Sequence, residues 1–289
     1  MKKTINQAIV FFVLLTGFAS CSKSNDTSGG TPSPTPTPTQ TFTRKAYVED
    51  FTGTWCGWCP LMSYTLEQKK ALHGKKLIYV GMHYGPSTNS FDPFHSTGFN
   101  PLLTRYGINA FPTGLVDRQT IVSSSTLAGN IDLSVATAAK VGIQLESTLT
   151  GTDCALKTTV KFVDNFSAGP VKLVLMLVED DLKYNQVNYL YNNSNYQTHP
   201  YYTAGNPMPN YTHNGVFRRT VTPIEGETIP SANTALNAQY IHNTTINVTG
   251  LPAATSRIIA LVISDNGTAS GAKVLNAQEV KIGQSQLFD

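Results

Sequence analysis

Residues 54–60 read Thr-Trp-Cys-Gly-Trp-Cys-Pro, and no other stretch of the chain has so definite a chemistry. The apolar run 46–51 before them predicts a strand. The run 61–72 after them predicts a helix closed by glycine, which is favoured just past a helix end. Cys56 would lie where this helix begins, and free N–H groups and the helix dipole favour a thiolate there. Because the thiolate is the nucleophile in disulfide exchange, we predict a redox pair in which Cys59 reaches back to Cys56.

Two other interpretations of the cysteine pair follow from its surroundings. Zinc needs about four ligands, and the remaining cysteines, Cys21 and Cys154, form no second pair, so we expect no metal site. An inert structural disulfide stays open as an alternative. Trp55 and Trp58, the only tryptophans, flank the pair with apolar surface on which a partner could dock.

The N-terminus has the pattern of an exported protein. Residues 1–20 combine a positive start with a short apolar core, which is typical of a signal peptide. Small residues before Cys21 resemble a bacterial lipoprotein signal, and this resemblance implies a lipid anchor on Cys21. Ordinary cleavage near Ala19, leaving a free thiol, is the alternative. Residues 21–43 are rich in Ser, Thr and Pro, so we predict a linker that tethers the chain to the membrane.

Composition narrows the classes of function. The chain of 289 residues is 40% hydrophobic, enough for one or two domains, and it has no internal apolar stretch long enough to span a membrane. It carries 21 basic and 18 acidic residues, and two of the basic ones lie in the signal segment. This near-neutral balance argues against a nucleic-acid partner. No cofactor is expected.

The segment after the first predicted helix continues an α/β pattern. The run 76–82 predicts a second strand, and strand–helix–strand order predicts a parallel pair. We further predict a short helix over 100–106, a strand over 113–116, a hairpin returning over 120–122, and a last helix with the stripe Leu127, Ile131, Val135 and Ala139. His83 and His95 are expected to be loop histidines rather than metal ligands with Asp92.

Residues 44–140 resemble a thioredoxin-fold domain. The likeness rests on residues 48–51 (Val-Glu-Asp-Phe), 55–59 (Trp-Cys-Gly-Trp-Cys), 100–101 (Asn-Pro), 106–108 (Tyr-Gly-Ile) and 111–113 (Phe-Pro-Thr). It implies that Cys56 attacks and Cys59 resolves. It also implies a cis peptide bond at Pro112, beside a substrate groove lined by Trp55, Trp58 and Phe111.

The same resemblance assigns a role to Asp50, six residues before Cys56, as a buried acid that helps deprotonate the resolving thiol. A buried carboxyl group with a raised pKa could do this. Glu49 could be the inward residue instead, which would make Asp50 an ordinary strand-end residue. The central pair Gly57-Trp58 differs from the Gly-Pro of thioredoxin itself, so the resemblance does not imply a reductase.

From residue 141 the pattern turns to strands. About seven are expected, and they predict an all-β domain over 141–289, an antiparallel, Ig-like sandwich with Cys154 as an inert core thiol. The insertion 181–215 interrupts this pattern and holds seven of the 13 tyrosines. Tyrosine and asparagine make adaptable contact surface, so the insertion could bind a protein or glycan partner. Simple packing over the sandwich is the alternative.

The whole layout resembles the outer membrane protein 28 family of Gram-negative lipoproteins. In the β part the likeness rests on residues 211–218 (Tyr-Thr-His-Asn-Gly-Val-Phe-Arg) and 274–280 (Val-Leu-Asn-Ala-Gln-Glu-Val). It implies a lipid-anchored location in the cell envelope, at the outer membrane. We therefore predict a membrane-anchored, extracytoplasmic thiol–disulfide oxidoreductase acting on protein thiols and disulfides. The alternative is a cell-surface binding or adhesion lipoprotein whose cysteine pair is only structural.

Overall fold

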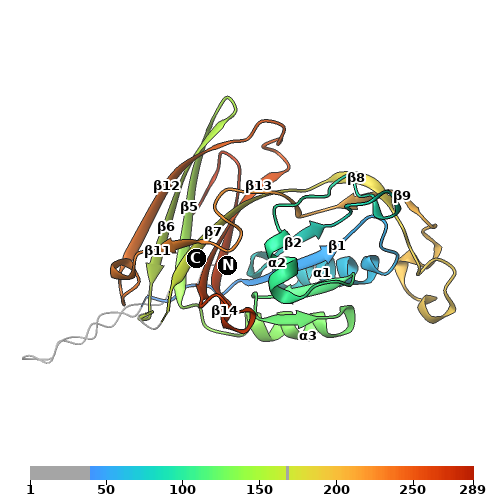
Figure 1. The fold of residues 1–289 in the computed structure, drawn as a ribbon, viewed down its shortest axis with the longest axis horizontal. Coiled ribbons are helices and arrows are strands. Elements are labelled where there is room, and N and C mark those ends of the chain that lie inside the picture. Colours follow the sequence, from blue (N-terminus) through green and yellow to red (C-terminus); the bar gives the residue numbers. More distant parts are fainter. Residues whose placement is uncertain (1–39, 167–168) are drawn as a thin grey trace, which may run out of the picture. The chain divides into compact units, whose positions relative to one another are not determined.

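The fold is built outward from β1 (Ala46–Thr52), the strand that leads into the cysteine pair. A computed structural model describes residues 40–166 and 169–289 (Figure 1), so the predicted signal segment, Cys21 and most of the linker lie outside the described residues. Every residue of β1 is buried, as expected for a central strand. It pairs in parallel with β2 (Leu77–His83) and antiparallel with β3 (Thr113–Val116), which confirms the predicted parallel pair.

Helices cover this first group of strands. The elements after β1 are α1 (Cys59–His73), β2, α2 (Asn100–Tyr106), β3, β4 (Thr120–Val122) and α3 (Ser124–Val135). Apolar side chains of α1 and α3 form one core with β1 and the strands beside it, including Met62, Leu66, Leu127 and Ile131. The last helix ends at Val135, so Ala139 lies beyond it, unlike the predicted stripe. Gly74 follows α1 with φ of 55°, as its predicted helix-ending role requires.

The remainder of the chain is dominated by strands. They are β5 (Val141–Thr150), β6 (Asp153–Phe162), β7 (Val171–Glu179), β8 (Leu182–Gln186), β9 (Met208–His213), β10 (Val216–Thr220), β11 (Glu227–Ile229), β12 (Gln239–Asn247), β13 (Ser256–Asp265), β14 (Ala272–Lys281) and β15 (Ser285–Gln286). Short 3₁₀ turns lie at Gly74–Lys76, Thr88–Ser90, Ser194–Tyr196, Pro200–Thr203, Ser231–Asn233 and Ala269–Gly271. No helix in the described ranges is both long and apolar enough to cross a membrane.

One sheet contains strands from both halves of the chain. Its nine strands run in the order β14-β13-β7-β10-β2-β1-β3-β4, with β11 on β7. The junction is β10, where Val216 pairs in parallel with Gly81 of β2. The Gly81 N–H also donates to the Gly215 carbonyl at 2.8 Å. A mixed α/β N-terminal part is therefore followed by a strand-rich remainder, while a separate thioredoxin-like domain over 44–140 stays a prediction.

A second sheet packs on the strand-rich part. Its order is β12-β6-β5-β15, and all its pairs are antiparallel. Apolar side chains of β5 and β6 meet those of β7 and β13 in one core, including Ile143, Leu156, Leu175 and Ile258. Cys154 is fully buried there as a free thiol, which confirms its predicted place.

The Tyr-rich insertion is more regular than predicted. Strands β8 and β9 lie within residues 181–215 and pair with each other in a two-stranded sheet of their own. The sequence predicted no strand in this segment. Its short alternations are rich in Tyr and Asn, which gives a weak strand signal from the sequence.

Candidate functional site: the cysteine pair and its surroundings

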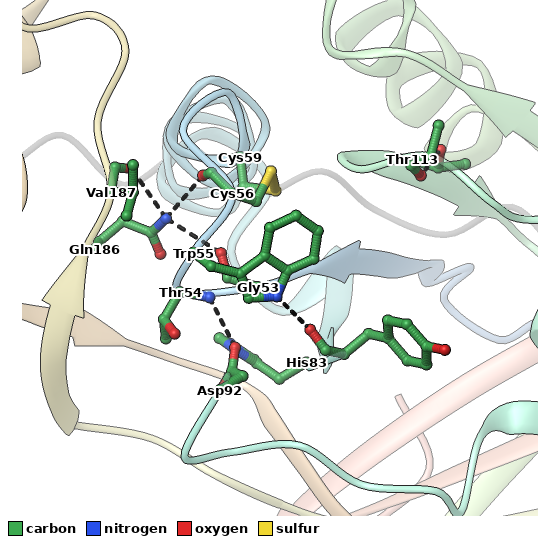
Figure 2. The surroundings of a disulfide bond; sticks show 12 residues. Gly53, Thr54, Trp55, Cys56, Cys59, His83, Asp92, Thr113, Gln186 and Val187 are labelled. Carbon is green, nitrogen blue, oxygen red and sulfur yellow. Dashed lines mark hydrogen bonds and ion pairs between the residues drawn. A yellow bond between two sulfur atoms is a disulfide. The ribbon is translucent and has the colours of Figure 1, made fainter. Parts of the chain in front are cut away.

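Cys56 and Cys59 are joined by a disulfide, with their Cα atoms 5.4 Å apart (Figure 2). Helix α1 begins at Cys59, so Cys56 lies in the turn that leads into it. That turn is fixed by backbone bonds from the Cys56 N–H to the Gly53 carbonyl (3.0 Å) and from the Cys59 N–H to the Cys56 carbonyl (3.2 Å). Pro60 lies in the first turn of α1, where its missing N–H removes no helix bond. Both cysteines are buried, with 4% and 1% of their surface exposed.

The loop containing Pro112 lies beside this turn. The Phe111–Pro112 peptide bond is cis, as the thioredoxin resemblance implies. The Trp55 ring meets the Phe111 ring edge-on at 5.6 Å between centroids. The Trp55 indole N–H donates to the Tyr84 carbonyl at 2.7 Å, which fixes the orientation of the ring (Figure 2). Two of the three predicted groove residues, Trp55 and Phe111, are therefore in contact.

Trp58, the third predicted groove residue, contacts the insertion instead. Its ring lies 5.7 Å from that of Tyr189 and 5.9 Å from that of Tyr196, between centroids. The Tyr189 ring also lies so close to Gly57 that a Cβ there would overlap it. Glycine directly after Cys56 is thus required by the ring of Tyr189, a residue more than 130 positions away in the sequence.

The insertion also binds the cysteine turn through hydrogen bonds. The Gln186 side-chain amide donates to the carbonyls of Cys56 (2.9 Å) and Gly53 (3.2 Å), as Figure 2 shows. The Val187 N–H donates to the Thr54 carbonyl at 2.8 Å. Sequence reasoning missed these contacts. The density of Tyr and Asn marked the insertion as unusual, but nothing in the sequence named its partner.

Asp50 and Glu49 are both buried, on opposite faces of β1. Glu49 receives hydrogen bonds from the guanidinium of Arg118, with the closer nitrogen at 2.8 Å. Asp50 lines a cavity together with Ser63 and Leu66 of α1, and its Oδ1 has no hydrogen-bond partner in the part of the chain that the structure describes. Burial raises the pKa of Asp50 to about 7, although a hydrogen bond from Ser63 lowers it in part. Of the two candidates, Asp50 is thus the acid that faces the helix of Cys59.

His83 is not the loop histidine that was predicted. It is the last residue of β2, it is buried, and its Nδ1 lies 2.8 Å from Asp92 Oδ2. Asp92 also accepts the Thr54 N–H at 2.7 Å, so the pair supports the entry to the cysteine turn (Figure 2). Burial alone would raise the pKa of Asp92, but the hydrogen bond and charge of His83 lower it overall. His95 does lie in the loop, where it accepts the Gly85 N–H.

Within residues 40–166 and 169–289, no group of three His, Cys, Asp or Glu side chains is placed to hold a metal ion. What the structure places on and against α1 is a disulfide and a buried carboxylic acid, that of Asp50.

Comparison with known proteins adds a family and a fold. The sequence matches the family "Outer membrane protein Omp28" over residues 100–286. No curated protein matches the chain significantly. The solved structure of HBP35 of Porphyromonas gingivalis is similar, with a TM-score of 0.64 and 17% identity over 83% of this chain and 76% of that one.

A protein from Agrobacterium tumefaciens gives a TM-score of 0.53 at 13% identity, over 85% of this chain and 97% of that one. At these identities the two structures support the fold alone. The family match covers well over half of the chain and confirms the predicted location in the bacterial cell envelope. Cys21 as the lipidated residue stays a prediction. The chain belongs to the Omp28 family of outer membrane proteins.

Proposed function

We propose that this protein is an extracytoplasmic thiol–disulfide oxidoreductase that acts through Cys56 and Cys59. The observation that supports this most is the place of the disulfide, at the start of α1, with Asp50 buried against the same helix. A carboxyl group whose pKa is raised to about 7 can accept and return a proton near neutral pH.

The proposed reaction begins when this protein, with Cys56 and Cys59 reduced, binds a substrate protein that contains a disulfide. The Cys56 thiolate attacks one sulfur of that disulfide, which forms a mixed disulfide and releases the other sulfur as a thiolate. The Cys59 thiol then gives its proton to the Asp50 carboxylate. The Cys59 thiolate attacks the Cys56 sulfur, which restores the internal disulfide and releases the second substrate sulfur as a thiolate. The two substrate thiolates take up protons from Asp50 and from solvent, which leaves the substrate as a dithiol. The reverse sequence oxidises a protein dithiol at the expense of the Cys56–Cys59 disulfide.

The alternative function is binding or adhesion, in which case the disulfide would have only a structural role. Two observations favour it. The insertion encloses the cysteine turn through hydrogen bonds from Gln186 and Val187, as in a fixed structural element. The same segment exposes 49% of Tyr189 and 42% of Tyr191, which offers aromatic contact surface for a partner.

Trapping distinguishes the two functions. In a Cys154→Ala background, a Cys59→Ser protein expressed in its own envelope should accumulate mixed disulfides on Cys56 that dithiothreitol releases. Adding Cys56→Ser should abolish them. An empty trap in the Cys59→Ser protein contradicts the oxidoreductase. Partner binding that survives loss of both cysteines would support the binding protein instead.

A further inference from the structure

A small cavity of about 30 Å³ lies under α1, on the side of β1 that carries Asp50. Five elements line it, and they contribute Asp50 from β1, Ser63 from α1, Gly81 from β2, Gln186 from β8 and His213 from β9. Its volume admits one or two water molecules, each of which needs roughly 10–15 Å³ of such space.

Two buried acceptors in this cavity lack a partner among residues 40–166 and 169–289. Asp50 Oδ1 and His213 Nε2 make no hydrogen bond, although the two residues are only 3% and 5% exposed. Burial, and then the charge of His83, lower the pKa of His213 to about 3, so its ring is neutral at pH 7. A hydrogen bond with the Tyr184 backbone opposes this shift, and it leaves Nε2 with a free lone pair. Because unpaired buried acceptors are unfavourable, one water that donates a hydrogen to each would satisfy both.

The register explains how a residue of the insertion comes to Asp50. Asp50 pairs with Gly81, and Gly81 pairs on its other side with Val216 of β10. His213 precedes Val216 by three residues across a tight turn. Gly81 has no side chain, so the space between Asp50 and His213 stays open.

The cavity also lies on the side of α1 that carries Cys59. Ser63, which lines the cavity, is four residues after Cys59, and residues four apart share one face of a helix. Asp50 thus faces the helix surface below the resolving sulfur.

We propose that His213 is a positioning residue of the redox site, which holds the Asp50 carboxyl group through a water molecule in this cavity. The proposal rests on the proposed function, because it supplies the environment in which Asp50 takes the Cys59 proton. That proton passes from the Cys59 sulfur to the carboxylate, and the Cys59 thiolate then forms a bond with the Cys56 sulfur. The bond between Cys56 and the substrate sulfur breaks, the substrate leaves as a thiolate, and the proton goes to that thiolate or to solvent when Asp50 ionises again. The atoms and charges balance without any further reactant.

Other ionisable groups face the same cavity, and a test must distinguish their titration from that of Asp50. Glu67 lines it from α1, and burial raises its pKa. Tyr79 and Tyr211 also line it, and burial raises the pKa of both phenols, so both stay neutral. His83 lines it from β2 in its pair with Asp92, and Lys183 acts on His213 from β8.

The test measures the pKa of Asp50 in the oxidised protein by ¹³C NMR of labelled aspartate carboxyl groups. Asp50→Asn identifies the signal, and a Glu67→Gln background removes the neighbouring carboxyl group. Gly81→Ala adds a methyl group whose nearest atoms, in His83 and Asn214, would lie at the ordinary distances of 3.6 and 3.8 Å. This variant should fold, displace the water and raise the Asp50 pKa by about one unit, because the carboxylate loses a donor.

His213→Leu should cause a similar rise, while His213→Gln keeps an acceptor and should restore a value near that of the wild type. Gly129→Ala, in open space on α3, is the matched control for the glycine substitution. The pH midpoint for resolution of the mixed disulfide by Cys59 should move upward with the Asp50 pKa. The proposal would be overturned if the Asp50 pKa stayed unchanged in both Gly81→Ala and His213→Leu. It would also be overturned if the pH midpoint for resolution of the mixed disulfide did not move with the Asp50 pKa. The NMR titration needs no substrate, so an empty cysteine trap would refute the redox function without affecting this measurement.

Discussion

Replacing Asp50 by asparagine should stabilise the protein at alkaline pH. Burial raises the pKa of Asp50 from 3.8 to about 7, so the folded protein binds this proton more tightly than the unfolded chain. The stability that the proton contributes is complete below pH 3.8 and is lost as the pH rises through 7. Each unit corresponds to about 1.4 kcal/mol, so the ionised carboxylate costs about 4 kcal/mol at pH 8.

Asparagine resembles the protonated acid in shape and carries no charge. We expect Asp50→Asn to raise the free energy of unfolding by about 4 kcal/mol at pH 8 and by less than about 1 kcal/mol at pH 4. Urea denaturation of the oxidised protein, followed by circular dichroism at both pH values, measures the difference. Asp153→Asn is the control, because Asp153 is an exposed aspartate on β6. A gain that is the same at both pH values, or absent at pH 8, would refute the reasoning.

The remaining predictions concern other parts of the chain. Arg118→Met leaves Glu49 as a buried unpaired charge and should cost about 3–5 kcal/mol in urea denaturation, part of which Glu49→Gln should recover; a cost below about 1 kcal/mol would contradict this. In the reduced native protein, a thiol reagent should label Cys56 well before Cys154, which is fully buried; equal rates by mass spectrometry would contradict both assignments. Cys21→Ala should move the protein out of the membrane fraction, and a wild-type mature N-terminus without lipid would disprove the anchor.

Local features of the site could be predicted from the sequence. The cysteine pair, the helix after it and the parallel strands follow from periodicity and turn residues, which depend on neighbours in the chain. For the buried acid, the sequence left two candidates, Asp50 and Glu49, and could not decide which of them points inward. Both proved to be inside because β1 is covered on both faces, so strand alternation could not separate them.

The remaining features depend on contacts between distant segments. A single pair of residues, Val216 and Gly81, defines the parallel junction between β10 and β2, and no local pattern encodes such a register. The hydrogen bond from Gln186 to the cysteine turn and the approach of His213 to Asp50 likewise join segments that lie more than 100 residues apart in the sequence. The prediction that His83 lies in the loop was wrong for a similar reason, because its hydrogen-bond partner Asp92 belongs to the loop that follows the strand.

The place of β10 in the nine-stranded sheet also bears on how the protein can be divided. An excised fragment of residues 44–140 would leave the edge of β2 without its neighbour, and the Gly81 N–H without the Gly215 carbonyl. It would also expose apolar side chains that now share one core with residues of β7 and β13, among them Phe51, Val80 and Phe99. An unpaired edge beside bared apolar surface favours self-association. We therefore expect that the segment containing the cysteine pair does not fold well as an isolated domain. Any engineered protein that uses this pair should include the strands that follow it.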